Sequence, residues 1–347
     1  MTRTLEIRFV LVRNGADFAA LYPIDGSAPT LRMTDSGDIK TSLSGEFAIP
    51  EGANWLTDQI RPELWIDGTA HPLGVFYPAT VREQEDETSR SVSIEAYDRG
   101  WVVRDTRVEN SIAYSAGANY LAPVQYLLTR AGITTALITP TSATLAEARG
   151  WWEPGISYLD IINELLGEIN YNALWFDAEG TAIVEPASVP TAQNIDHVLN
   201  DSDIQSLLLP TFNAQTDVYS APNVFIVTCS NPDKSGPMVA TAVNDNPQSP
   251  LSTARRGRRI CRLERVDNIA SQAELQAYAN RMRTESLISG ETLTVQTALL
   301  PGFGVGDVTA LHYGEFTGIC IERSWTMELR VGGTMTHTME KVVLNLD

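Results

Sequence analysis

Apolar and polar positions alternate along both ends of the chain, and this alternation predicts β-strands. Val92 and Ile94 alternate with polar neighbours, and the same period of two recurs around Trp325. Successive side chains of a strand point to opposite faces of a sheet, so the pattern is typical of strands with one buried face. The sequence therefore predicts a β-rich unit over residues 1–108 and a second one over residues 201–347.

Turn-forming dipeptides indicate where these strands reverse. Asp67-Gly68 and Gly332-Gly333 each separate two strand-like segments, and these residue types tolerate the positive φ of a tight hairpin turn. The charged stretch Arg82–Arg90 is expected to be a solvent-exposed connection between strands.

Helical spacing appears chiefly in the centre of the chain. Asn119–Arg130 carries apolar residues three and four positions apart. Ser157 and Ser271 are each followed three residues later by an acidic residue, close to the pattern of a capping box, so a helix is expected to begin at each. A shorter helical piece is expected at Asp17–Leu21.

The change from strand spacing to helix spacing divides the chain into parts. We predict a middle α+β domain over residues 109–200, between the two β-rich units. Residues 231–268 include a stretch rich in Pro, Asn, Ser and Asp, so a small insertion in the second unit is expected there. The predicted fold class is β-rich α+β.

Charge and cysteine content narrow the classes of function. The chain has 347 residues with a net charge of −18, which argues against tight binding of nucleic acid because phosphate binding needs a basic surface. Cys229, Cys261 and Cys320 lack CxxC spacing and are expected to be free thiols, buried or half-buried, in a reducing compartment. With no signal peptide and no run of ~20 apolar residues, assembly in a cytoplasm is expected.

No motif in the sequence indicates catalysis, a metal or a cofactor. The four histidines lie too far apart in sequence to form a metal pair on one helix or strand, and are expected to be isolated: His71, His197, His312 and His337. Gly302–Asp307 resembles a phosphate loop only superficially, because no GKT or GKS follows, and is expected to be a turn before a strand. We therefore predict no catalytic residue, no cofactor and no metal ligand.

Clusters of charge have ordinary interpretations. The acidic residues Glu83, Glu85, Asp86 and Glu87 lie on the charged connection and are interpreted as a solvated loop rather than a glycosidase pair. The basic run Arg255–Arg259 is expected to be a protein contact or a solvated loop, with nucleic acid or lipid as the alternative.

The aromatic pair Trp151-Trp152 leaves two interpretations open. It is expected to be a packing anchor before the helix at Ser157, because aromatic residues dominate core burial. The alternative is a platform on which a sugar ring stacks.

Several stretches resemble one protein family in the expected order along the chain. They are ELWIDGTAHPLGVFYP and SVSIEAYDRGWVV in the first unit, NYLAPVQYLLTRAGI and PGISYLDIINELLGEINYNALWFDAEG in the middle, and AELQAYANRM, PGFGVGDVTAL and FTGICIERSWTMELRVGGTMTHTMEKVVL in the last. Together they resemble the gp27-like tail hub proteins of bacteriophages and related contractile injection systems, and the N-terminal part of tail-associated lysins.

This resemblance implies an architecture and a set of partners. It implies two tube-like antiparallel β-barrel or sandwich domains, and a homotrimer whose ring closes the tail tube and lines the DNA channel. The implied partners are the tail tube or distal tail ring, a tail-tip or spike protein, the tape-measure protein and transiting DNA. The implied location is the virion tail, with roles in host attachment and genome ejection and no enzymatic activity. A carbohydrate- or receptor-binding tail-tip module, or a cell-wall hydrolase, is the alternative.

Overall fold

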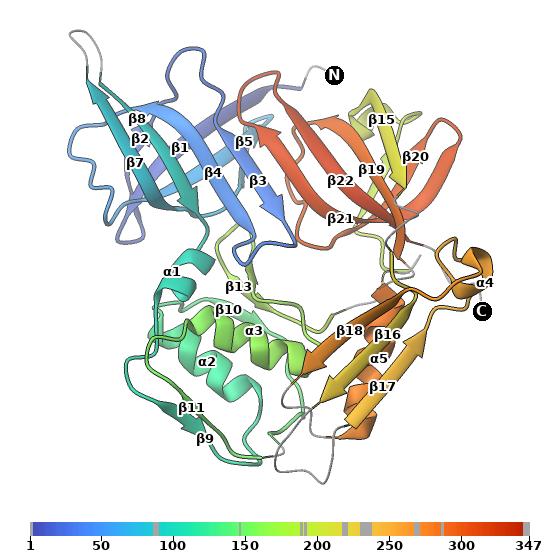
Figure 1. The fold of residues 1–347 in the computed structure, drawn as a ribbon. Coiled ribbons are helices and arrows are strands. Elements are labelled where there is room, and N and C mark those ends of the chain that lie inside the picture. Colours follow the sequence, from blue (N-terminus) through green and yellow to red (C-terminus); the bar gives the residue numbers. More distant parts are fainter. Residues whose placement is uncertain are drawn as a thin grey trace.

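The computed structural model of the protein describes residues 3–85, 90–145, 147–187, 190, 193–216, 221–229, 238–266, 271–285 and 288–342. Figure 1 shows two β-rich parts side by side at the top of the molecule, with the helices below them. The predicted β-rich α+β fold is confirmed.

The first sheet is built from strands near the N-terminus. Its order is β2-β1-β5-β6, and neighbouring strands are antiparallel. The predicted turn at Asp67-Gly68 joins β5 to β6, and its residues have φ values of 49° and 83°. The strands are β1 (Leu5–Arg13), β2 (Ala16–Leu21), β5 (Gln59–Ile66) and β6 (Thr69–Pro72).

The helical piece predicted at Asp17–Leu21 is wrong, because these residues belong to β2. Asn14 and Gly15 have φ values of 52° and 78° and turn the chain back onto β1. An Asn-Gly pair is a strong hairpin signal, and here it outweighs the local helical spacing.

The second sheet joins the two ends of the sequence. Its order is β15-β19-β22-β21-β3-β4-β8-β7, with β20 pairing with β21 and β14 pairing with β20. The link is the antiparallel pair β3–β21, in which Met33 lies opposite Trp325. In the described part of the chain, the two β-rich ends therefore share one sheet. Its strands are β3 (Thr30–Thr34), β4 (Thr41–Ala48), β7 (Tyr77–Glu85), β8 (Arg90–Tyr97), β14 (His197–Asn200), β15 (Leu208–Thr216), β19 (Ile288–Ala298), β20 (Val308–Tyr313), β21 (Phe316–Glu328) and β22 (Thr334–Val342).

The connection predicted at Arg82–Arg90 is wrong over its first residues, because β7 continues to Glu85 and pairs with β8. Glu83 and Glu85 are exposed on this strand, and Arg90 approaches Glu85 at 3.4 Å. Asp86 and Glu87 lie outside the described residues.

Strand β14 belongs to the second β-rich unit, although its residues fall inside the predicted middle domain of 109–200. It runs parallel to β20, with His197 opposite Thr309, and the 3₁₀ helix η1 (Ile204–Ser206) follows it. A four-residue strand carries too short a pattern to be recognised without its partner.

The predicted C-terminal hairpin is confirmed, with Met327 of β21 opposite Met335 of β22. Its loop is longer than the predicted two-residue turn at Gly332-Gly333, because β21 ends at Glu328. Leu329 is buried, and its N–H donates to the carbonyl oxygen of Pro29 at 2.7 Å. The loop thus packs against the N-terminal unit before it turns.

The middle unit combines helices with short strands. The predicted cap at Ser157 is confirmed, since its side chain accepts a hydrogen bond from the N–H of Leu159. Gly132 ends the preceding helix with a φ of 78°. The elements are α1 (Gly100–Asp105), β9 (Ile112–Tyr114), α2 (Leu121–Arg130), β10 (Ala136–Ile138), β11 (Arg149–Trp152), α3 (Tyr158–Glu168), β12 (Trp175–Phe176) and β13 (Ala182–Val184).

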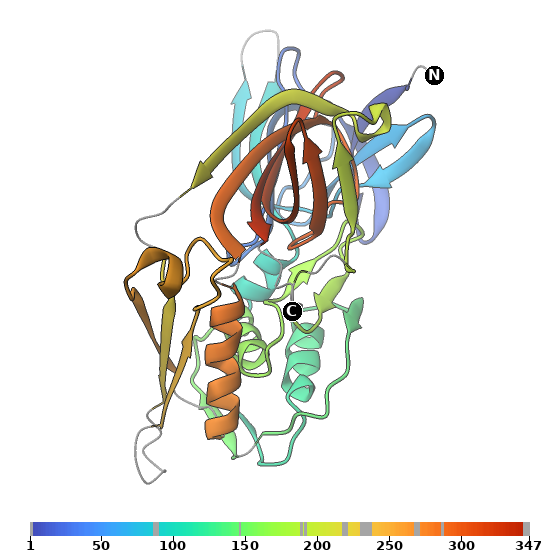
Figure 2. The same cartoon turned by 90° about the vertical axis from the view of Figure 1, so that its right-hand side faces the viewer.

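A separate small unit is inserted between β15 and β19. Helix α5 covers one face of its sheet through Leu275, Ala279 and Met282, and Figure 2 shows this helix beside the strands. The predicted insertion at 231–268 covers only part of this unit, and its residues 231–237 and 267–268 lie outside the described ones. The elements are β16 (Val224–Cys229), β17 (Met238–Val243), α4 (Thr253–Arg256), β18 (Cys261–Val266) and α5 (Gln272–Glu285), with sheet order β17-β16-β18.

The main hydrophobic core spans both β-rich ends. Leu43 and Phe47 of β4 belong to the same buried cluster as Trp325 and Met335 from the C-terminal strands. The middle unit and the inserted unit each bury their own cluster. Burial of apolar surface therefore couples the chain ends to each other more directly than to the segments between them.

Candidate functional site

The three main parts of the chain meet around a cavity of about 300 Å³. The N-terminal unit supplies β3, the start of β4 and the segment before β7, the middle unit supplies the turn after β12, and the C-terminal unit supplies residues 302–307 and β21. Aromatic rings from all three parts line the cavity: Phe76, Trp175, Phe176, Phe303 and Trp325.

The segment Gly302–Asp307 is a turn that leads into β20, as predicted. Gly302 and Gly306 have φ values of 92° and 75°, which explains why glycine is needed at both positions. The N–H of Gly304 donates to Asp307 Oδ2 at 2.6 Å. In a phosphate loop, a backbone N–H at this place would donate to the bound phosphate. Here the Asp307 carboxylate accepts the hydrogen bond from the Gly304 N–H instead.

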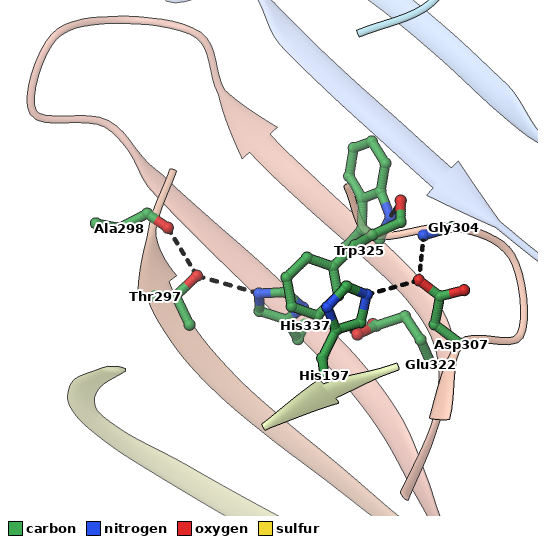
Figure 3. Close-up of polar contacts among 9 residues, drawn as sticks. His197, Thr297, Ala298, Gly304, Asp307, Glu322, Trp325 and His337 are labelled. Atoms are coloured by element: carbon green, nitrogen blue, oxygen red, sulfur yellow. Dashed lines mark hydrogen bonds and ion pairs between the residues drawn. The ribbon is translucent and has the colours of Figure 1, made fainter. Parts of the chain in front are cut away.

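A stack of rings extends from this turn into the C-terminal sheet, as Figure 3 shows. His197 of β14 lies over Phe303 with ring centroids 3.8 Å apart, and its Nε2 donates to Asp307 Oδ2 at 2.8 Å. The ring of His337, on β22, lies tilted against that of Phe303, with the two ring centroids 4.7 Å apart. Trp325 Nε1 donates to the carbonyl oxygen of Phe303 at 3.1 Å.

His337 and Glu322 form a fully buried pair. His337 Nδ1 lies 2.9 Å from Glu322 Oε2, and His337 Nε2 lies 3.1 Å from Thr297 Oγ1. The Thr297 hydroxyl donates its single proton to the carbonyl oxygen of Ala298, so His337 Nε2 must carry the proton in its own contact with Thr297. A further proton lies between Nδ1 and Glu322, because two lone pairs would repel at this distance.

Burial raises the pKa of Glu322, against the opposing effect of His337. Glu322 Oε1 has no hydrogen-bond partner among the described residues, which favours a protonated carboxyl over a carboxylate. Glu322 and His337 therefore share a proton inside the core of the C-terminal sheet.

A second buried carboxyl, Asp98, fixes the end of the first β-rich unit. Asp98 Oδ2 accepts a hydrogen bond from the N–H of Thr41, and Oδ1 accepts one from the N–H of Gly100, both at 2.8 Å. Burial raises the pKa of Asp98 to about 6. One side chain thus joins β4, β8 and α1 beside the cavity.

The four histidines, expected to be isolated surface or strand residues, all lie on strands. His197 and His337 are not isolated, because strands distant in sequence bring both rings against that of Phe303. His71 lies on the edge strand β6, and His312 contacts Thr317 across the β20–β21 hairpin. The described residues contain no group of three side chains placed to hold a metal ion.

Of the aromatic pair Trp151-Trp152, Trp152 is a packing residue. Trp152 is 8 % exposed, packs edge-on against Tyr114 and belongs to the middle core. A sugar-stacking role for Trp152 is therefore wrong, since its ring face is covered. The Trp151 side chain lies outside the described part.

Side chains of the basic run Arg255–Arg259 form hydrogen bonds with nearby backbone carbonyl groups. Ser252 caps the short helix α4, Arg255 donates to the carbonyl oxygen of Pro247 at 2.8 Å, and Arg256 donates to that of Ala221 at 2.6 Å. These contacts close the loop of the inserted unit.

The expected free thiols are confirmed, with one difference in location. Cys229 and Cys320 are buried in sheet cores, as expected, whereas Cys261 is exposed at the start of β18. Strand β18 is at the edge of its sheet, and its first three residues are all exposed.

Known structures share the fold over nearly the whole chain. A tail protein from Neisseria meningitidis MC58 matches with a TM-score of 0.67 at 14% identity, covering 96% of both chains. The 43 kDa tail protein of prophage MuSo2 from Shewanella oneidensis matches with a TM-score of 0.67 at 10% identity, covering 96% of this chain and 98% of that one.

A protein of a secretion machine has the same fold. The E. coli c3393 protein, described as a component of the type VI secretion system with structural similarity to the T4 bacteriophage tail proteins gp27 and gp5, matches with a TM-score of 0.52 at 10% identity, covering 99% of this chain and 77% of that one. The fold expected from the sequence resemblance is therefore confirmed.

Comparisons based on sequence alone find no related protein. No family model matches the chain, and a comparison with curated proteins finds none at a significant level. Among the described helices, none is long and apolar enough to cross a membrane.

Proposed function

We propose that this chain is a structural subunit of a phage tail or baseplate, acting as the hub at the end of the tail tube. The observation that carries the proposal is the fold shared with tail proteins across 96% of both chains. The similarity includes the β-rich ends and the parts between them, so it concerns the whole arrangement rather than one common domain.

We further propose that three copies form a ring. Each chain contributes two β-rich units, so three chains present six units, which fits a six-fold tail tube. The strands β7 and β15 lie at the two ends of the described sheet path, so each has one edge without a neighbouring strand in that path. Such edges are suited to pairing with a neighbouring chain. The tube or distal tail ring, a spike protein and the tape-measure protein are the proposed partners.

The charge of the chain supports a role beside moving DNA. A net charge of −18 repels phosphate, so DNA passing through the ring would not bind to it. We propose that the ring lines the DNA channel during genome ejection and host attachment, and that it resides in the virion tail after assembly in the host cytoplasm. We also propose that the chain has no enzymatic activity, which a zymogram with host peptidoglycan tests.

Mass measurement and microscopy test the ring. Light scattering on the full chain alone is expected to give a particle of three times the 38.0 kDa chain mass, and a heavier particle when its tail-tube partner is added. Negative-stain images are expected to show closed rings. Monomers under both conditions, at high protein concentration, would contradict the proposal.

A further inference from the structure

The proposed role as a ring subunit gives no function to the cavity between the three parts of the chain. Its volume of about 300 Å³ is at the small end of ligand pockets and suits a molecule the size of an amino-acid side chain. Its walls are mainly apolar and aromatic, so a ligand would bury carbon against them. The exposed residues of the lining, Glu179 and Gly302, mark the opening to solvent.

Among the described residues that line this cavity, every ionisable side chain is a carboxyl group, and none is a Lys, Arg or His. They are Asp98, Asp177, Glu179 and Asp307. Asp307 Oδ2 is used by Gly304 and His197, whereas Oδ1 accepts no hydrogen bond from a described residue. Asp98 is 4 % exposed and lies at the inner end.

Aromatic walls and carboxylates together select for one chemistry. The face of an aromatic ring attracts a cation, and Trp does so most strongly. Trp175 reaches from the middle unit toward the C-terminal turn, where a Cβ placed on Gly304 would lie 3.5 Å from its ring. An anion would meet only carboxyl groups, and a neutral apolar molecule would make no use of the charge of Asp307 and Glu179.

We propose that this cavity binds a compact organic cation, an alkylammonium or a guanidinium group with a short apolar stem. The cation lies against Trp175, with its charge toward Asp307 and Glu179. Because the walls come from three parts of the chain, occupancy stabilises their relative arrangement. The group is supplied either by a free small amine or by a Lys or Arg side chain of a tail partner.

Calorimetric titration of the full chain tests this proposal. n-Butylammonium and agmatine are expected to bind saturably at one site, whereas 1-butanol and butyrate are expected not to bind. Equal binding of 1-butanol, or no saturable binding of either cation, overturns the proposal. N-acetyl-lysine amide, with N-acetyl-norleucine amide as its neutral control, separates the two sources. Tighter binding of the lysine derivative than of butylammonium supports a partner side chain, and binding of butylammonium alone supports a free amine.

Variants locate the binding. Trp175→Leu is expected to weaken cation binding about fivefold or more, while Trp65→Leu, on β5 away from the cavity, leaves it unchanged. If Trp175→Leu does not fold, Glu179→Gln at the exposed opening serves instead, with about twofold weaker binding expected. Unchanged affinity in Glu179→Gln together with affinity independent of salt contradicts the proposal. None of these outcomes depends on ring formation.

Discussion

Buried carboxyl groups are the residues whose chemistry depends most on this fold. Glu322 and Asp98 are 0 % and 4 % exposed, and burial raises the pKa of each. Both are held by hydrogen bonds from parts of the chain that lie far apart in sequence or in different elements. Each therefore links the stability of the protein to pH.

Glu322→Gln tests the buried proton of the Glu322–His337 pair. The amide N–H of Gln can donate to His337 Nδ1 in place of that proton, so we expect the free energy of unfolding at neutral pH to change by about 1 kcal/mol or less. Glu322→Ala leaves the ring nitrogen unpaired and a cavity beside it, and is expected to cost about 2–4 kcal/mol. Urea unfolding of both variants measures the difference. Equal losses for Gln and Ala would show that no proton lies between the two side chains.

Asp98→Asn tests the second buried carboxyl through pH. The carboxyl has a pKa of about 6 when folded against an ordinary value of 3.8, so its stabilising contribution is complete below 3.8 and is lost as pH rises through 6. The difference in unfolding free energy, wild type minus variant, is expected to fall by about 2 kcal/mol between pH 4 and pH 7. The exposed Asp67→Asn is the control. A pH-independent difference for Asp98→Asn would refute the shift.

At the scale of elements, the pairing of β3 with β21 decides the architecture. The strands are separated by nearly the whole chain, yet Met33 and Trp325 lie opposite each other and share one core. Asp35 adds an ion pair to Arg323 at 2.6 Å beside this seam. The two β-rich ends are thus expected to unfold together.

Leu31→Ala tests this coupling. Leu31 is fully buried and lies between Met327 of β21 and Leu43 of β4, so truncation is expected to cost about 2–5 kcal/mol. Hydrogen exchange is expected to accelerate in β4 and β22 together, because both belong to the same sheet. Leu165→Ala, in the core of the middle unit, is the control and is expected to act on α2 and α3. Unchanged exchange in β22 would show that the ends unfold separately.

Strand pattern predicted most elements but not the position of Glu322. Counting back by twos from Trp325 and Met327 places Arg323 on the buried face and Glu322 outside. The pairing of β21 with β22 shifts register between Glu322 and Ser324, so Glu322 turns inward toward His337. A β-bulge of one residue exchanges the faces of a strand, and alternation alone does not reveal it.

At the scale of the whole molecule, the net negative charge argues against DNA binding. The chain carries 43 acidic and 25 basic residues, and the basic run Arg255–Arg259 is partly engaged by its own loop. We expect no retardation of a linear DNA duplex in a gel-shift assay at low salt, because a net negative surface releases no counterions from phosphate. Retardation that disappears with added salt would instead indicate a basic binding surface.

The sequence alone determined the local structure: the hairpin at Asp67-Gly68, the cap at Ser157, the helix after Ser271 and the final hairpin. These depend on period, turn residues and caps, which act within a few positions of the chain. Only the tertiary structure decided the shared sheet, the inserted unit beginning at β16, the ring stack at Phe303 and the cavity beside it. Those features depend on contacts between residues that lie from tens to nearly 300 positions apart, and no local pattern records which distant strands will pair.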